Sequence, residues 1–193
     1  MLSEKRGPCI VILAAPSGSG KTTIASKLMD AVPSVSFSVS ATTRPARSHE
    51  IDGVHYHFMS LPDFERHLAD GRLLESEEVY PGCWYGTLLS VVEKSHKEAP
   101  ILLDIDVVGA LRVKEHYRER CLALFISPPS AEELESRLRA RGTESEKSLA
   151  ERSSKARYEL TFADSFDHVV VNDDLETAVK AVIDLVSDFI RRC

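Results

Sequence analysis

The sequence is poor in several features that mark particular classes of protein. It has 4 cysteines in 193 residues, and Cys9, Cys83, Cys121 and Cys193 form no CxxC pair. Its 7 histidines are not grouped at the spacing of metal ligands. This pattern argues against a disulfide framework or a structural zinc site, and it favours a reducing, cytoplasmic compartment.

Positive charge and long apolar runs are also scarce. The formal net charge is -6, which argues against a broad binding face for duplex DNA. No apolar stretch approaches the roughly 18 residues needed to span a bilayer. Lys5 and Arg6 precede a short apolar run at 9–15, as in a signal peptide, but this run leads directly into a phosphate-binding pattern. We therefore expect no secretion, no membrane and no nucleic-acid partner.

What remains is the composition of an ordinary globular protein. Hydrophobic residues make up 43% and charged residues 28%, while 9 glycines and 9 prolines are too few for a collagen-like or low-complexity chain. At this length one domain with modest insertions is expected. Such a chain buries roughly 70% of the surface that its unfolded form exposes. Its core therefore needs no covalent or metal support.

Short apolar runs alternate with helical patterns along much of the chain. The runs predict strands buried on both faces. They lie at 10–14, 101–103, 122–126 and 169–171. The helical patterns lie at 22–32, 107–117 and 131–141, and a last apolar stripe runs from Val179 to Ile190. This alternation predicts an α/β fold with a parallel sheet flanked by helices.

Two regions interrupt the alternation. Residues 36–97 contain strand-like pieces at 37–40, 56–58 and 73–79 around a short helix that starts near Ser60, which indicates a mixed α/β insert. The core is then formed by residues 1–35 and 98–193. Within it, about 137–160 is dense in both charge signs and poor in apolar residues, which predicts an exposed helical lid.

The first strand is followed by a phosphate-loop pattern. APSGSGKT matches GxxxxGK[ST] except that Ala15 replaces the first glycine. Gly18 and Gly20 let the backbone curl so that amides point inward, and the following helix presents its positive end. The expected ATP ligands are Ala15, Pro16, Ser17, Gly18, Ser19, Gly20, Lys21 and Thr22. Lys21 supplies charge to the outer phosphates and the Thr22 hydroxyl is suited to Mg²⁺.

A second candidate site follows the strand at 101–103. Asp104 and Asp106 come directly after apolar residues, and a carboxylate there is placed to hold Mg²⁺, directly or through water. The alternative for Asp106 is a helix N-cap, since a helical pattern follows it.

Seven further segments, taken with the phosphate loop, resemble the guanylate kinase family. They span most of the chain in the family's order. The segments are SVSATTRPAR (38–47), GVHYHF (53–58), LLESEEV (73–79), WYGT (84–87), LLDIDVVGA (102–110), PPSAEELESRLRARGTES (128–145) and VVVNDD (169–174). The resemblance implies a P-loop nucleoside-monophosphate-kinase fold with an NMP-binding insert and a lid. It also implies Mg²⁺-assisted transfer of the terminal phosphoryl of ATP to GMP, and to dGMP as well.

The resemblance also implies which residues bind GMP. Arg44, Arg47 and Tyr56 would grip its phosphate, with Tyr85 adding a hydroxyl, and guanidinium forks suit phosphate oxygens. The residues implied to read the base are Ser40, Glu75, Thr87 and Asp106. Guanine offers N1–H and its amino group as adjacent donors to one carboxylate, so Glu75 would set base choice. Without the resemblance, solvated surface positions are the default for Arg44 and Arg47, and a solvent-facing strand position is plausible for Glu75.

In the lid, Arg137 and Arg141 fall on one helical face, and Arg152 lies on the next predicted helix. By resemblance these three close over ATP and, with Lys21 and Arg44, form the catalytic set. A charge-laced surface helix is the alternative. Asn172 would lie near adenine, or else serve a turn.

Two departures from the family pattern bear on these assignments. YPGCWYGT is one residue longer than the usual turn, which affects Tyr85, and Ser153 replaces an apolar residue, which predicts looser lid packing. Two rival functions remain: a related kinase of another phosphorylated acceptor, and a phosphopeptide-binding module without catalysis. An intact phosphate loop disfavours the module. The sequence leaves the choice between monomer and homodimer open.

Overall fold

The computed structural model describes residues 7–140 and 146–193 and contains two sheets within them. The larger sheet is parallel throughout, as the alternating pattern predicts. Its strands, in order across the sheet, are β2 (Ser36–Phe37), β7 (Ile101–Asp104), β1 (Ile10–Ala14), β8 (Cys121–Ser127) and β9 (His168–Val171). The phosphate loop follows the central strand β1, so it lies at the carboxyl edge of the sheet, where ligands bind in such folds.

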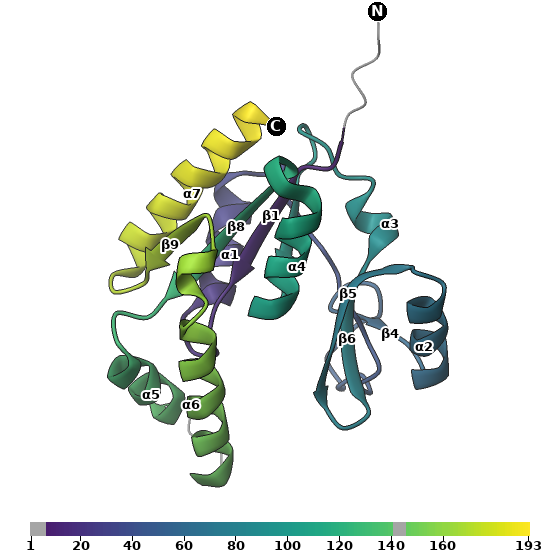
Figure 1. The fold of residues 1–193 in the computed structure, drawn as a ribbon, viewed down its shortest axis with the longest axis horizontal. Coiled ribbons are helices and arrows are strands. Elements are labelled where there is room, and N and C mark those ends of the chain that lie inside the picture. Colours follow the sequence, from purple (N-terminus) through teal and green to yellow (C-terminus); the bar gives the residue numbers. More distant parts are fainter. Residues whose placement is uncertain (1–6, 141–145) are drawn as a thin grey trace, which may run out of the picture.

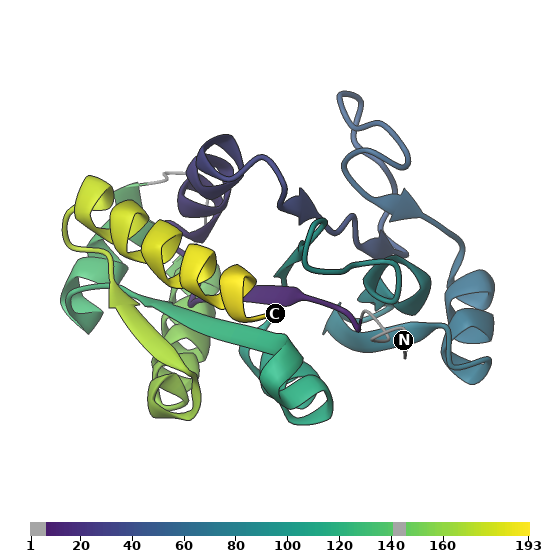
Figure 2. The same cartoon turned by 90° about the horizontal axis from the view of Figure 1, so that it is seen from above.

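Helices cover both faces of this sheet. Helices α1 (Lys21–Ala31) and α7 (Leu175–Arg192) pack on one face, and α4 (Val107–Tyr117) packs on the other (Figures 1 and 2). Strand β1 is fully buried because its residues alternate between the two sides. Val11 and Leu13 enter the core beneath α1 and α7, whereas Ile10 and Ile12 enter the core beneath α4.

The edge strand β9 differs from the expectation of burial on both faces. Val170 is buried against the core with α7, but Val169 and Val171 are 43% and 52% exposed. The prediction was wrong here because an apolar run does not reveal whether its strand lies at the centre or the edge of the sheet.

The insert is built on the second sheet. It mixes parallel and antiparallel pairs in the order β4 (His57–Phe58), β3 (Ala41–Thr42), β6 (Cys83–Leu88) and β5 (Leu73–Tyr80), with helices α2 (Leu61–Ala69) and α3 (Leu89–Val92). Helix α2 begins next to Ser60, as predicted, and Ser60 caps it while exchanging hydrogen bonds with Asp63. The strand expected at 37–40 is split: Ser36–Phe37 pairs with β7 in the larger sheet, and the insert's sheet begins at β3.

Two helices form the region that we expected to be a lid. They are α5 (Ala131–Ala140) and α6 (Glu146–Leu160). A short 3₁₀ turn follows α6 at Ala163–Ser165, and another follows α4 at Arg118–Arg120. Leu134 and Ala156 are buried together with Leu160 beside them, so the helices share a small apolar core that the charge pattern did not predict. No helix in the described ranges is long and apolar enough to cross a membrane.

Candidate active site

A cavity of about 820 Å³ lies where the core, the insert and α6 meet. The whole phosphate loop from Ala15 to Thr22 lines it, as do Asp104 at the end of β7 and Asp106 just after it. From the insert come Ser40, Arg47, Tyr56, Glu75 and Tyr85, and from α6 comes Arg152. The structure therefore gathers residues from distant parts of the chain around one space.

The phosphate loop has the backbone that its sequence predicts. Gly18 and Gly20 adopt φ of 96° and 89°, a region that side chains rarely tolerate, and Gly20 is the N-cap of α1. The loop thus ends at the positive end of an eleven-residue helix, an arrangement suited to phosphate.

Lys21 and Asp104 form an ion pair beside this loop, with their side chains 20% and 25% exposed. The Lys21 ammonium also lies 3.4 Å from the carbonyl oxygen of Ile105. Thr22 and Asp104 both line the cavity and offer the oxygen ligands that Mg²⁺ prefers. Mg²⁺ usually takes only one or two protein ligands and completes its shell with water and phosphate. These two residues therefore fit such an ion, although the described residues contain no cluster of three or more metal-ligating side chains.

Glu75 lines the cavity from β5. Its Oε1 accepts a hydrogen bond of 2.7 Å from the hydroxyl of Thr87, which is fully buried on β6. Burial raises the pKa of the Glu75 carboxyl to about 7, with a further contribution from the nearby Asp106. A half-buried carboxylate held in a defined direction by Thr87 is suited to accept hydrogen bonds from two adjacent N–H donors.

Asp106 is both a helix cap and a cavity residue. Its carboxylate accepts hydrogen bonds from Val108 N at 2.8 Å and Gly109 N at 3.0 Å, so the N-cap alternative is observed. A Cβ at Gly109 would lie 2.8 Å from Asp106 Oδ2 and 3.0 Å from Glu75 Oε2. The missing side chain at Gly109 therefore lets the two carboxylates approach each other over the start of α4.

Arg44 is fixed by several groups of the insert. Its guanidinium donates to both oxygens of Glu50, at 2.9 and 2.8 Å, and to the hydroxyl of Tyr85 at 3.2 Å. It also lies 5.3 Å from the ring centre of Tyr56. Hydrogen bonds to Glu50 are the main reason that the pKa of Arg44 is raised further above its usual value.

Arg47, Tyr56 and Tyr85 present polar side chains to the cavity near Arg44. Burial raises the pKa of the Tyr56 hydroxyl, which keeps it protonated and able to donate. The β5–β6 ladder is irregular between Glu78 and Tyr80, whereas Glu77 and Tyr85 pair in register.

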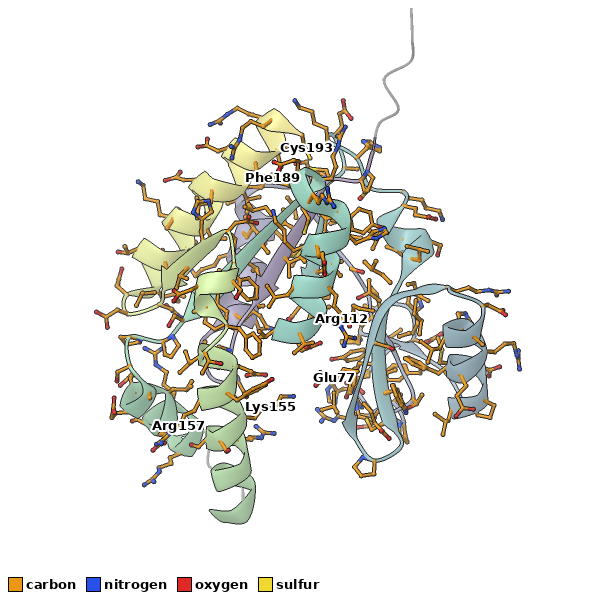
Figure 3. All side chains as sticks on the ribbon, in the orientation of Figure 1. Glu77, Arg112, Lys155, Arg157, Phe189 and Cys193 are labelled. Carbon is orange, nitrogen blue, oxygen red and sulfur yellow. The ribbon has the colours of Figure 1, made fainter. Side chains whose placement is uncertain are left out.

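The lid residues are placed less uniformly. Arg152 lines the cavity, while Arg137 donates to Glu133 at 2.8 Å and to the carbonyl of Asn172 at 3.2 Å. Arg141 lies outside the described residues. Lys155 on α6 reaches across to Glu77 on β5 at 3.3 Å, and Figure 3 shows the two side chains facing each other.

Asn172 supports the phosphate loop from behind. Its side chain is buried and donates a hydrogen bond of 2.7 Å to the carbonyl of Ser19. A Cβ at Gly20 would lie 2.4 Å from its Nδ2. Asn172 therefore holds the loop and, through its carbonyl, Arg137.

Comparison with known proteins identifies the family to which this chain belongs. The guanylate kinase family model matches residues 8–189. A guanylate kinase of Salinibacter ruber is 51% identical over 94% of this chain and 96% of its own length. One from Chlorobium luteolum is 47% identical over 94% and 92%.

The chain belongs to the guanylate kinase family.

The solved structures agree with the family's fold. A guanylate kinase crystal structure from Anaplasma phagocytophilum superposes with a TM-score of 0.75 at 32% identity, covering 95% of this chain and 87% of that one. The α/β fold implied by the resemblance and the family membership itself are thus confirmed.

Sequence reasoning missed Glu50, Glu77 and Lys155 in this guanylate kinase fold. Lys155 and Glu77 are 78 positions apart, so no local pattern joins them. Glu50 carries a weak signal: it follows Arg44 and Arg47 at six- and three-residue steps, and its importance emerges only once the loop is folded.

Proposed function

We propose that this chain transfers the terminal phosphoryl group of ATP to GMP, and to dGMP, in the cavity described above. A half-buried carboxylate, Glu75, and a phosphate loop line one space, and this juxtaposition carries the proposal. In the reaction a phosphate oxygen of GMP attacks the terminal phosphorus of ATP, that phosphorus leaves the bridging oxygen, and ADP and GDP result. No covalent enzyme intermediate is needed, and the cytoplasm is the expected compartment.

The insert would bind GMP. The ionised Glu75 would accept from N1–H and the amino group of guanine, aligned by the hydrogen bond from Thr87, with Ser40 and Asp106 beside it. Adenine presents an acceptor at N1 and would leave Glu75 unsatisfied. A site built on buried hydrogen bonds rejects such a mismatch by about 10⁴-fold. Arg47, Tyr56 and Tyr85 would meet the phosphate, with the charge of Arg44 behind them.

The phosphate loop would bind ATP. Its backbone amides and the Lys21 ammonium would hold the phosphates, and Asn172 keeps the loop in place. Thr22, and Asp104 through water, would hold Mg²⁺, which offsets phosphate charge when bound. Lys21 is already poised at the carboxyl edge of β7 by Asp104 and Ile105.

The lid would stabilise the charge that spreads over the transferring group. Arg152 already lines the cavity, and Arg137 and Arg141 are proposed to join it when α5 and α6 close over ATP. Closure also excludes water, which would otherwise compete with GMP for the phosphoryl group.

An acceptor panel tests this proposal. ADP release is measured with GMP, AMP, CMP and UMP, for the wild type and Glu75→Gln. We expect turnover with GMP to exceed that with AMP by orders of magnitude, and we expect Glu75→Gln to lose most of the GMP reaction. Equal turnover of GMP and AMP by the wild type would refute the assignment of Glu75. Failure to bind ATP, together with no turnover of any nucleotide, would favour the interaction-module alternative.

A further inference from the structure

Glu50 is a nearly buried carboxylate that ties together the two arginines of the insert. Its side chain is 7% exposed. Its Oε2 accepts a hydrogen bond from Arg44 Nη1 at 2.9 Å, and its Oε1 accepts one from Arg44 Nη2 at 2.8 Å. The same Oε2 atom accepts from the backbone N–H of Arg47 at 2.7 Å, and Glu50 N donates to Arg47 O at 3.0 Å. One side chain thus fixes the guanidinium of Arg44 and the backbone of Arg47.

The contacts of Arg44 limit what it can offer a phosphate. A guanidinium has five N–H donors. Glu50 takes two, Pro45 O takes one at 2.8 Å, and the Tyr85 hydroxyl takes the Nε–H at 3.2 Å. With Glu50 in place, Arg44 therefore has one N–H left and no free bidentate edge, and it contacts Tyr85 and Tyr56, which both line the cavity.

The hydroxyl of Tyr85 gains direction from this arrangement. Because its oxygen accepts from Arg44 Nε–H, its own hydrogen is available to a group in the cavity. A donor that itself accepts from a cation is a better donor, since linked hydrogen bonds polarise one another.

We infer that Glu50 is a positioning residue for the phosphate of the acceptor nucleotide: it holds Arg44 against Tyr85 and sets the backbone at Arg47, so that Tyr85 and Arg47 face that phosphate. This inference rests on the proposed function and adds a residue to it. The Arg44 guanidinium holds the pKa of Glu50 at about 2, so the carboxylate stays ionised throughout the working range.

The experiment compares ligands that differ only in the phosphate. Binding of GMP and of guanosine is measured by calorimetry for the wild type, Glu50→Gln and Glu50→Asp. Gln keeps the shape and one acceptor but loses the charge, so we expect GMP affinity to fall about tenfold while guanosine affinity stays within twofold. Glu50→Asp keeps the charge on a shorter side chain, so its GMP affinity should lie between those of the wild type and Glu50→Gln.

A matched control is Glu78→Gln. Glu78 also accepts a turn amide of the insert, Gly82 N at 2.7 Å, but it contacts no arginine in the described residues. It should bind both ligands like the wild type.

An equal loss of GMP and guanosine affinity in Glu50→Gln would overturn the inference in favour of a general structural role, and so would an unchanged GMP affinity. If Glu50→Gln fails to fold, Glu50→Asp decides by the same comparison. If the wild type turns over GMP but the Glu50 variants bind GMP as tightly as the wild type does, only the role of Glu50 is refuted. Wild-type protein that does not bind GMP refutes the proposed function as well.

Discussion

Glu75 shows how one side chain links the fold to the choice of substrate. Its carboxyl is buried against β6 and beside Asp106, and both conditions favour the neutral acid. Reading the N1–H and amino donors of guanine requires the ionised form. Without a ligand, the surroundings of Glu75 therefore disfavour the ionised carboxylate that guanine binding requires.

This conflict predicts that base binding depends on pH. With the Glu75 pKa near 7, guanosine affinity should rise as the pH increases from 6 to 8, and binding near neutrality should release a proton. Guanosine is preferable to GMP because a phosphate group titrates near pH 6 itself. Calorimetry in buffers of different ionisation enthalpy measures the proton, and Glu75→Gln should lose both effects. Guanosine affinity that is flat over this range would contradict the assignment.

The same group should limit stability. The folded-state pKa of about 7 exceeds the ordinary value of 4.5, so the folded protein holds this proton more tightly than the unfolded chain. Stability from this group is then fully present below pH 4.5 and is lost as the pH rises through 7. Glu75→Gln should unfold at higher denaturant than the wild type at pH 8, by at most about 3 kcal/mol, and little differently at pH 4.5. Glu77→Gln on the same strand is the control, and an equal gain at both pH values would argue against this origin.

The limits of sequence reasoning are also visible at single residues. Glu75, Lys21 and Tyr85 line the cavity. Their positions could be anticipated because each lies in a motif that also specifies the backbone around it. The contact of Arg44 with Glu50 was not foreseen, because Glu50 lies on a loop whose shape the sequence does not specify. A side chain's type can be read from the sequence, whereas its hydrogen-bond partners depend on the folded loop.

At the scale of elements, the parallel sheet follows directly from the spacing of apolar runs. The strands β1, β7 and β8 and the helix α4 lie at or within a residue of the expected limits, because each is bounded by a capping or turn residue. Edge strands are less predictable. Strand β2 is two residues long and β9 is covered on one face, and neither property is encoded in local hydrophobicity.

Asn172, in the turn after β9, stabilises the phosphate loop through its hydrogen bond to Ser19 O. Asn172→Ala removes the buried hydrogen bond to Ser19 O and leaves that carbonyl without this partner, which should cost about 1–3 kcal/mol of unfolding free energy. Because the loop is loosened, the KM for ATP should rise, whereas that for GMP should change little. Steady-state kinetics and denaturant unfolding measure these effects, with Asp173→Ala as the exposed neighbour. A larger change in the KM for GMP than for ATP would contradict this role.

At the scale of the whole molecule, the core, the insert and helix α6 meet around one cavity. The insert joins the core through β5 and α4, where Glu75 and Asp106 approach over Gly109. The ion pair of Lys155 with Glu77 joins α6 to the insert across the opening. Exposed pairs of this kind contribute little energy, so α6 and the insert are free to adjust when nucleotides bind.

The central claim is that this one cavity holds two nucleotides at once, with phosphates meeting between Lys21 and Arg47. A compound that joins adenosine and guanosine through a polyphosphate chain tests it by calorimetry against ATP and GMP alone. If both ends bind together, the second contact is intramolecular and the joined compound should bind at least about 100-fold more tightly than either nucleotide. An affinity no higher than that of ATP alone would contradict the account.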